Sequence, residues 1–302
     1  MTTDAPTENT AASFRTGRHD WSSFFFSGLT GLATLLILAI LAVILGNITL
    51  LGWEGLSWRF VTAGTEQDMF DVEKAGVMPM IVGTSARVIL MSIFVLPIGV
   101  TTAVYLTEYA ENTSPITRII RGAVNNLPSI VFGLFGLGFF ISFIGSHMDG
   151  VVNPDLENPV WGKPALLWAS LTLAVMTLPV VIVATEESLK AIAPGLREAS
   201  LALGATKLQT IIKIVLPQAL PGIMTGGILA VSRAAGEVAP ILFTGAAYYM
   251  ANLPHSLSDQ FMDLGYHVFI LSTQSPNIEQ TRPILYATVL VLLILTFALN
   301  VV

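Results

Sequence analysis

Six separate runs of apolar residues, each about twenty residues long, constrain this chain more than any other feature of its sequence. They cover residues 24–46, 77–96 with an extension to 106, 126–144, 166–184, 223–247 and 283–302. An α-helix rises about 1.5 Å per residue, so a run of about twenty residues crosses a hydrocarbon core about 30 Å thick. The pattern predicts an all-α membrane protein with about six transmembrane helices.

Composition agrees with this prediction. Of the 302 residues, 53% are hydrophobic and only 11% are charged, against about 25% charged residues in soluble domains. No cluster of Lys and Arg is dense enough to suggest nucleic-acid binding. The absence of cysteine excludes disulfides, thiolate metal sites and cysteine nucleophiles. His255 and His267 lack companions at ligand spacing, so no metal site is predicted.

Positive charge orients the helices. Eight Lys and Arg residues fall in the N-terminal tail and in the loops after the second and fourth runs, and four fall in the alternate loops. The positive-inside rule therefore places the N-terminus and the loop after the fourth run in the cytoplasm. We expect residues 1–22 to form a cytoplasmic tail and residues 23–302 a transmembrane domain. The first run lacks a convincing cleavage site and is interpreted as a retained anchor.

The loop between the fourth and fifth runs, about residues 186–221, is unusually elaborate. It includes the sequence "REASLALGATKLQTIIKIVLPQALPGI". Pro194 begins one short helical pattern, and Gly204 is expected to end it. A second, amphipathic pattern places Leu208, Ile211, Ile212 and Val215 on one face. Pro217 and Pro221 are expected to stop that helix and start the fifth span. Spacing alone is equally consistent with an ordinary amphipathic connector.

This loop resembles a known motif. Glu198, Ala199 and Ser200 are followed after three residues by Gly204 and, after nine more, by Ile214, Leu216 and Pro217. The spacing is similar to the EAA motif of ABC importer permeases, E-A-A-x3-G-x9-I-x-L-P, with Ser for the second Ala. Two other segments, "NNLPSIVFGLFGLG" and "SRAAGEVAPILFTG", resemble helices of phosphate permeases of the PstA type. The similarity covers roughly residues 60–302.

The resemblance implies a type I ABC importer permease fold and a phosphate-importing complex in the bacterial cytoplasmic (inner) membrane. Such a permease pairs with a homologous PstC-like permease, a PstB-like ATPase dimer and an external PstS-like phosphate-binding protein. The seven motif residues named above would couple the chain to the ATPase. The chain has no nucleotide-binding G-x-x-x-x-G-K-[ST] loop, so it is not expected to be an enzyme. No cofactor is expected in this chain, and ATP and magnesium would bind the partner ATPase.

The sequence departs from the family pattern at three places. Val238 replaces the usual Thr, Arg87 is not typical of the second span, and the usual basic C-terminal extension does not follow Val302. We therefore expect the natural gene to encode a short basic tail beyond Val302.

Three charged residues lie inside apolar runs, namely Arg87, Arg233 and Glu237. Charges inside a membrane are costly and are a functional hypothesis by default. Their sum is +1, which favours passage of an anion, and a guanidinium group matches phosphate oxygens bidentately. Asn126 and Ser129 add polar groups at the start of the third helix, where an anion is favoured. These five residues are the candidate substrate pathway. The alternatives are helix capping for Asn126 and Ser129, and a purely structural role for the charges.

Other functions stay open on the residues alone. A permease for sulfate, molybdate or phosphonate would need the same arginines, because these oxyanions present similar oxygens. A secondary anion transporter is a weaker alternative because inverted repeats and a second acidic relay residue are not visible. An intramembrane enzyme is disfavoured because G-x-S-x-G, H-E-x-x-H and paired carboxylates are missing at membrane depth.

Overall fold

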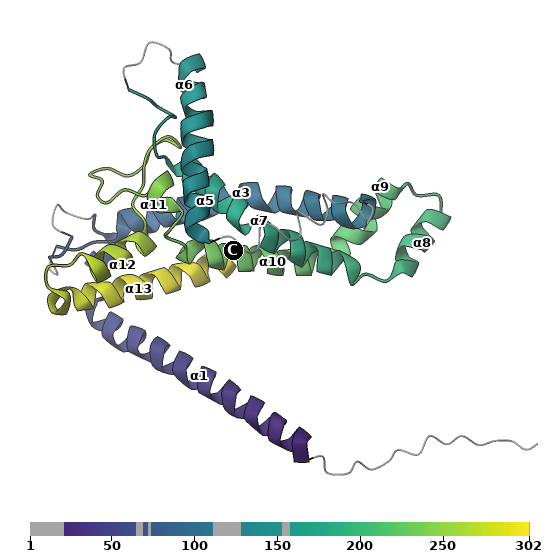
Figure 1. The fold of residues 1–302 in the computed structure, drawn as a ribbon, viewed down its shortest axis with the longest axis horizontal. Coiled ribbons are helices and arrows are strands. Elements are labelled where there is room, and N and C mark those ends of the chain that lie inside the picture. The colour runs from purple at the N-terminus through teal and green to yellow at the C-terminus, as the bar shows by residue number, and fades with distance from the viewer. Residues whose placement is uncertain (1–20, 65–68, 72–73, 111–127, 153–157, 302) are drawn as a thin grey trace, which may run out of the picture. The chain divides into compact units, whose positions relative to one another are not determined.

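The computed structural model describes residues 21–64, 69–71, 74–110, 128–152 and 158–301, with side chains from residue 24 onward. Its elements are almost all helical (Figure 1). In chain order they are α1 (Trp21–Gly55), α2 (Trp58–Thr62), α3 (Met78–Val104), η1 (Tyr105–Tyr109), α5 (Ser129–Phe135), η3 (Gly136–Gly145), α6 (Ser146–Val152), α7 (Leu166–Lys190), α8 (Pro194–Ala202), α9 (Lys207–Thr210), η4 (Ile211–Val215), α10 (Leu216–Gly236), α11 (Ile241–Thr244), α12 (Leu264–Thr273) and α13 (Ile278–Val301).

Six helical stretches in the described part of the chain are long and apolar enough to cross a membrane. They are Phe24–Gly55, Met78–Tyr109, Ser129–Val152, Leu166–Lys190, Lys207–Gly236 and Ile278–Val301. The six predicted helices are therefore confirmed, and the chain is a multi-pass membrane protein. Most stretches extend beyond the apolar runs because helices continue into polar residues at either end. The 1–20 segment of the predicted cytoplasmic tail lies outside the described residues.

The prediction for the fifth helix is wrong at both ends. It was expected over 223–247 but runs continuously from Lys207 to Gly236. Pro217 and Pro221 do not break it. In η4 the hydrogen bonds run one residue further back than in an α-helix, as from the Leu216 N–H to the Ile211 carbonyl. This π turn rearranges the hydrogen bonds just before Pro217, so the helix tolerates a residue without an N–H.

The chain divides into two units, Met1–Asn47 and Ile48–Val302. In the first unit, the described part of α1 taken by itself carries large apolar side chains all round, including Phe25, Leu32 and Leu36. A helix that is apolar on every side suits lipid or other transmembrane helices as its neighbours.

Helix α7 is the centre of the second unit. In its most apolar stretch 67% of the residues are buried, and the helix contacts α3, α10, α5 and α11. Met91, Leu173 and Ala234 are fully buried in the core that these helices share. In Figure 1 the short helices α8 and α9 lie at one end of α7 and α10, and α11 and α12 lie at the other. The coupling loop and the break after α10 are thus at opposite ends of the unit.

The segment between α11 and α12 is anchored on the beginning of α7. Backbone hydrogen bonds join the Leu166 N–H to the Asp259 carbonyl at 2.8 Å and the Leu167 N–H to the Leu257 carbonyl at 3.0 Å. A short β-bridge pairs Ala246 with Phe261. These contacts fix the residues that lead into α12, among them Asp263.

Candidate substrate pathway and coupling loop

Arg233 and Glu237 form the predicted pair at the end of α10. The Arg233 Nε lies 3.4 Å from the Glu237 Oε1, and the two side chains are 50% and 23% exposed. Glu237 itself is not helical, since its backbone turns to φ −81° and ψ 123° directly after Gly236. The pair therefore joins the last turn of a helix to the first residue of the break. The expected i, i+4 contact is present, although both residues were expected within one helix.

The Arg233 guanidinium keeps unused donors. It carries five N–H groups, and within the described part of the chain only the Nε–H has a hydrogen-bond partner, the Glu237 carboxylate. A half-exposed guanidinium with two available Nη groups can bind a carboxylate, phosphate or sulfate group through parallel hydrogen bonds. Glu237 can in turn release Arg233, or its carboxylate can accept a hydrogen bond from a protonated oxygen of the anion.

The third span packs tightly beside this break. A Cβ added to Gly133 would lie 2.9 Å from the Pro240 Cα, in the segment that follows the break, so only a residue without a side chain fits at this contact. Ser129 is the first residue of α5 and is half-buried behind Pro128. Among the described residues, no hydrogen bond joins Ser129 to Arg233 or Glu237. Asn126 lies outside the described residues.

Arg87 has a different environment from the one expected. Its side chain is fully buried and forms an ion pair with Asp263, with 2.8 Å between Nη2 and Oδ2. The sum of +1 over the three charges in the apolar runs left out Asp263, which neutralises Arg87 and brings the sum over these four residues to zero. No role was predicted for Asp263 from the sequence, although an Asp directly before an apolar helix is a common N-cap. Nothing in the spacing could show that this cap meets Arg87 from a helix far away in the sequence.

The coupling loop contains the first short helix expected there, α8, whereas the second, α9, continues through η4 into α10 as one helix. Gly204 follows α8 with φ +86°, the left-handed conformation predicted for a helix end. Thr206 then caps α9, with its side chain and that of Gln209 forming a reciprocal capping box. The T-x-x-Q pattern was present in the sequence and predicts such a cap. The Ser200 and Thr210 hydroxyls, 2.8 Å apart, join the two helices.

The motif residues divide into an exposed half and a packed half. Glu198, Ala199 and Gly204 are exposed, and the neighbouring Leu203 is 89% exposed. Ser200 is buried, Ile214 and Leu216 are half-buried, and Pro217 is exposed on the continuous fifth helix. The amphipathic prediction holds only in part. Ile211 and Val215 are buried, whereas Leu208 and Ile212 are exposed at 58% and 54%.

Two cations of the loop hold the end of the second span. Arg197 donates to the Glu108 Oε1 from Nε at 3.2 Å and from Nη2 at 3.1 Å. It also donates to the carbonyl of Leu189 in the last turn of α7 and to that of Ile192 just after the helix. The Lys207 ammonium donates to the Glu108 carbonyl and lies 4.5 Å from the centre of the Tyr109 ring. Sequence reasoning treated these residues only as charges that orient the protein.

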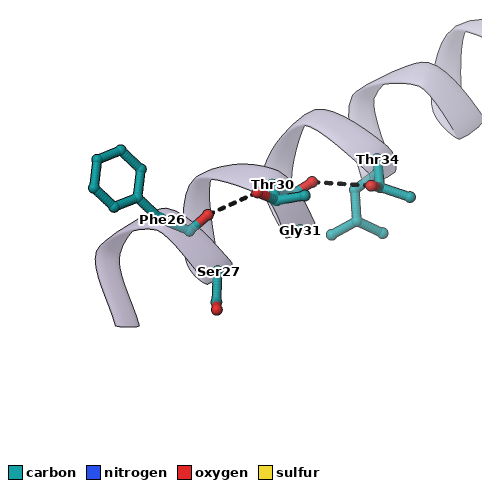
Figure 2. Close-up of a pocket in the computed structure, with 6 residues that line it drawn as sticks. Phe26, Ser27, Thr30, Gly31 and Thr34 are labelled. Carbon is teal, nitrogen blue, oxygen red and sulfur yellow. Dashed lines mark hydrogen bonds between the residues drawn. The ribbon is translucent and has the colours of Figure 1, made fainter. Parts of the chain in front are cut away.

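A surface hollow on α1 is a separate feature (Figure 2). It is lined by residues of that helix alone, including Phe26, Thr30 and Thr34. The Thr30 and Thr34 hydroxyls donate to the carbonyls of Phe26 and Thr30 on their own helix. None of the residues that line the hollow is charged, so it offers an anion no ion pair and we assign it no substrate.

Comparison with known proteins gives consistent matches. The family model described as "Binding-protein-dependent transport system inner membrane component" matches residues 96–302. A probable ABC transporter permease protein, YqgI of Bacillus subtilis, is 32% identical over 221 residues, covering 72% of this chain and 68% of the relative. The phosphate transport system permease protein PstA 1 of Mycobacterium tuberculosis is 31% identical over 237 residues, covering 77% and 69%.

A solved structure is also similar. The bacterial alginate ABC transporter, in complex with an alginate pentasaccharide-bound periplasmic protein, contains a chain that matches with a TM-score of 0.60. The match covers 93% of this chain and 95% of that chain at 16% identity. At this identity the likeness concerns the fold alone, and it confirms the expected type I importer permease fold.

Proposed function

Because the chain belongs to the family of binding-protein-dependent transport system inner membrane components, we propose that it is the transmembrane permease subunit of an ATP-driven importer for inorganic phosphate. Support for phosphate comes from relatives named as phosphate transport permeases. Support from the geometry comes from the half-exposed Arg233–Glu237 pair at the end of α10. Arg233 contacts the anion in transit, and Glu237 holds Arg233 between turnovers.

The chemistry of this pair suits phosphate. The available Nη groups of Arg233 match two oxygens of a tetrahedral anion. Glu237 can accept a hydrogen bond from protonated phosphate, whereas sulfate has no proton to donate at neutral pH. Ser129 and Asn126, at the beginning of the third span, are proposed to add polar contacts along the same pathway. The second candidate is a permease for another oxyanion, because arginine alone does not separate phosphate from sulfate or molybdate.

The exposed half of the coupling loop is the proposed ATPase contact. Glu198, Ala199 and Leu203 are accessible at the tip, while Arg197 and Ser200 tie that tip to the bundle. An ATPase dimer that binds here would supply ATP and magnesium chemistry. A homologous permease would complete the pathway, and an external binding protein would deliver phosphate. The N-terminus and the coupling loop would face the cytoplasm.

The test is binding-protein-dependent phosphate uptake by the complete complex in proteoliposomes. Arg233→Gln should lower uptake by about tenfold to a hundredfold with normal assembly, because charge-assisted hydrogen bonds contribute roughly 1.5–3 kcal/mol. Arg233→Lys should restore only part of it, since an ammonium lacks the planar fork. Lys163→Gln is the matched control, because it removes one exposed cation elsewhere.

Glu237→Gln separates transport from scaffolding. If Glu237 holds Arg233 between turnovers, this variant should bind phosphate but lose coupling between transport and ATP hydrolysis. A purely structural pair gives another pattern, in which each single change lowers complex yield and the double variant Arg233→Gln/Glu237→Gln restores it. Restored yield with normal uptake in the double variant would contradict the transport role. Uptake of sulfate in preference to phosphate by the unaltered complex would favour the second candidate.

A further inference from the structure

A buried ion pair contacts the backbone of Glu237, one of the proposed pathway residues. Arg87 on α3 and Asp263 before α12 are 2.8 Å apart, and neither side chain is exposed. The Asp263 Oδ2 also accepts a hydrogen bond from the Thr84 hydroxyl at 2.9 Å, and its Oδ1 accepts one from the Tyr266 N–H at 3.1 Å. The carboxylate thus joins α3 to the first turn of α12. Because both charges are fully buried, an anion in the pathway cannot reach them in this conformation.

The same guanidinium group also binds the end of α10. Arg87 Nη1 donates to the Ala234 carbonyl at 2.9 Å and to the Glu237 carbonyl at 3.4 Å. Its Nη2 donates to the Ala235 carbonyl at 3.3 Å. The last carbonyls of a helix lack partners within the helix, and a cation there is favourable. One side chain therefore caps α10 and contacts the backbone of Glu237, whose carboxylate pairs with Arg233.

Backbone packing makes this junction tight. One turn before Arg87, a Cβ added to Gly83 would lie 2.1 Å from the Met262 carbonyl oxygen. The Leu264 N–H donates to the Thr84 hydroxyl at 3.0 Å. Helix α3 and the start of α12 are consequently in direct contact, so a displacement of either moves the Arg87 guanidinium against the end of α10.

We propose that Arg87 and Asp263 are positioning residues that hold the end of α10, and with it the Arg233–Glu237 pair, in the resting geometry of the pathway. The inference rests on the proposed function, because that function makes the Arg233–Glu237 pair part of the pathway. The contacts of Arg87 and Asp263 themselves do not depend on the identity of the anion. It gives Arg87 a role distinct from the anion contact expected from its place in an apolar run. The competing explanation is that Arg87 only neutralises Asp263 so that the bundle can enter the membrane.

Arg87→Lys distinguishes these explanations. A lysine can neutralise Asp263, but a compact ammonium cannot bridge Asp263 and the separate carbonyls of Ala234 and Glu237 as a planar fork does. If neutralisation is the whole role, Arg87→Lys and the double variant Arg87→Met/Asp263→Asn should both behave normally. Asn at position 263 keeps a good helix cap, so the double variant removes charge without removing the cap.

The first measurement reports the position of α10 directly. The chain contains no cysteine, so Ala235→Cys introduces a single thiol at a residue that is only 1% exposed. In the complete complex in proteoliposomes, we expect a maleimide to label this thiol at least about fivefold faster when Arg87→Lys is also present, as local opening frees the helix end. Gly236→Cys is the control, because Gly236 is already exposed and its labelling rate should not change. An unchanged rate at position 235 would overturn the proposal.

The second measurement reports coupling. We expect Arg87→Lys and the double variant to raise ATP hydrolysis in the absence of the binding protein by at least about threefold, with the KM for phosphate uptake within about twofold of the unaltered complex. A tenfold rise in KM with intact coupling would mean that Arg87 contacts the anion, which contradicts the proposal. Normal coupling in the double variant would leave neutralisation as the explanation. Failure of the unaltered complex to import phosphate would instead contradict the proposed function. The labelling rates would still test whether Arg87 holds the end of α10.

Discussion

Gly204 determines the shape of the coupling loop at the level of a single residue. Its φ of +86° turns the chain between α8 and α9, and it is the only residue of the described ranges in the left-handed region. A Cβ at Gly204 would meet nothing within 4 Å, so packing does not require glycine there. The requirement is conformational, because residues with a Cβ adopt the left-handed region at a cost of about 1–2 kcal/mol.

We therefore predict that Gly204→Ala destabilises the loop by about 1 kcal/mol and reduces ATPase stimulation, with assembly retained. Gly195→Ala is the matched control. Gly195 lies within α8, has equally open space around its Cβ position, and should gain helical stability from the same substitution. Thermal unfolding of the purified complex and its substrate-stimulated ATP hydrolysis measure both effects. Equal behaviour of the two variants would exclude a conformational role for Gly204.

At the scale of elements, the sequence predicts the helices better than their ends. The six apolar runs identify the spans because about twenty apolar residues have few other uses. The start of the fifth helix was predicted wrongly because Pro217 and Pro221 were interpreted as helix breaks. The π turn of η4 accommodates Pro217, and a change in hydrogen-bond register leaves no clear mark in the residue pattern. The break after Gly236 was missed for a related reason. Apart from Glu237, the residues that follow it, Val238 to Pro240, are as apolar as the helix itself.

The contact between the coupling loop and the second span is also an element-scale feature. Arg197 binds Glu108 at the end of η1 and two carbonyls in and just after the last turn of α7, with the two charged side chains only 21% and 11% exposed. We expect this contact to transfer motion of the loop through η1 to α3, the helix that carries Arg87.

We predict that Arg197→Met lowers the number of phosphate ions transported per ATP by at least about fivefold, a typical magnitude for coupling between sites. The variant leaves the Glu108 carboxylate and the two carbonyls without this donor, which also costs about 1–3 kcal/mol of stability. Lys190→Met is the control, since it removes a 55% exposed lysine paired with Glu186 at the same end of α7. Exposed pairs contribute little. Unchanged stoichiometry in Arg197→Met would show that α3 does not receive the motion of the loop.

At the scale of the whole molecule, the candidate site was predictable in its parts and not in its connections. Arg233 and Glu237 were found because a charge within an apolar run is conspicuous and four residues bring both to one side. Asp263 was overlooked because it lies outside the six apolar runs, in the segment between the fifth and sixth, where an acidic residue was taken to be solvated. Its burial against Arg87 depends on how α3, α10 and the start of α12 meet around α7. Such long-range contacts arise from packing and are not encoded in local spacing.

The contact between α7 and α10 sets where α10, and hence Arg233, lies in the molecule. A Cβ added to Gly226 would lie 2.6 Å from the Ala184 Cβ, so the two helices meet without room for a methyl group. We predict that Gly226→Ala destabilises the complex by about 1–3 kcal/mol despite the better helix propensity of alanine. Gly138→Ala is the control, since its Cβ would meet nothing within 4 Å. Adding Ala184→Gly removes the opposing methyl group, so the double variant should recover complex yield and phosphate uptake together. Recovery of yield without uptake would show that α10 needs more than close packing on α7 to place Arg233 for transport.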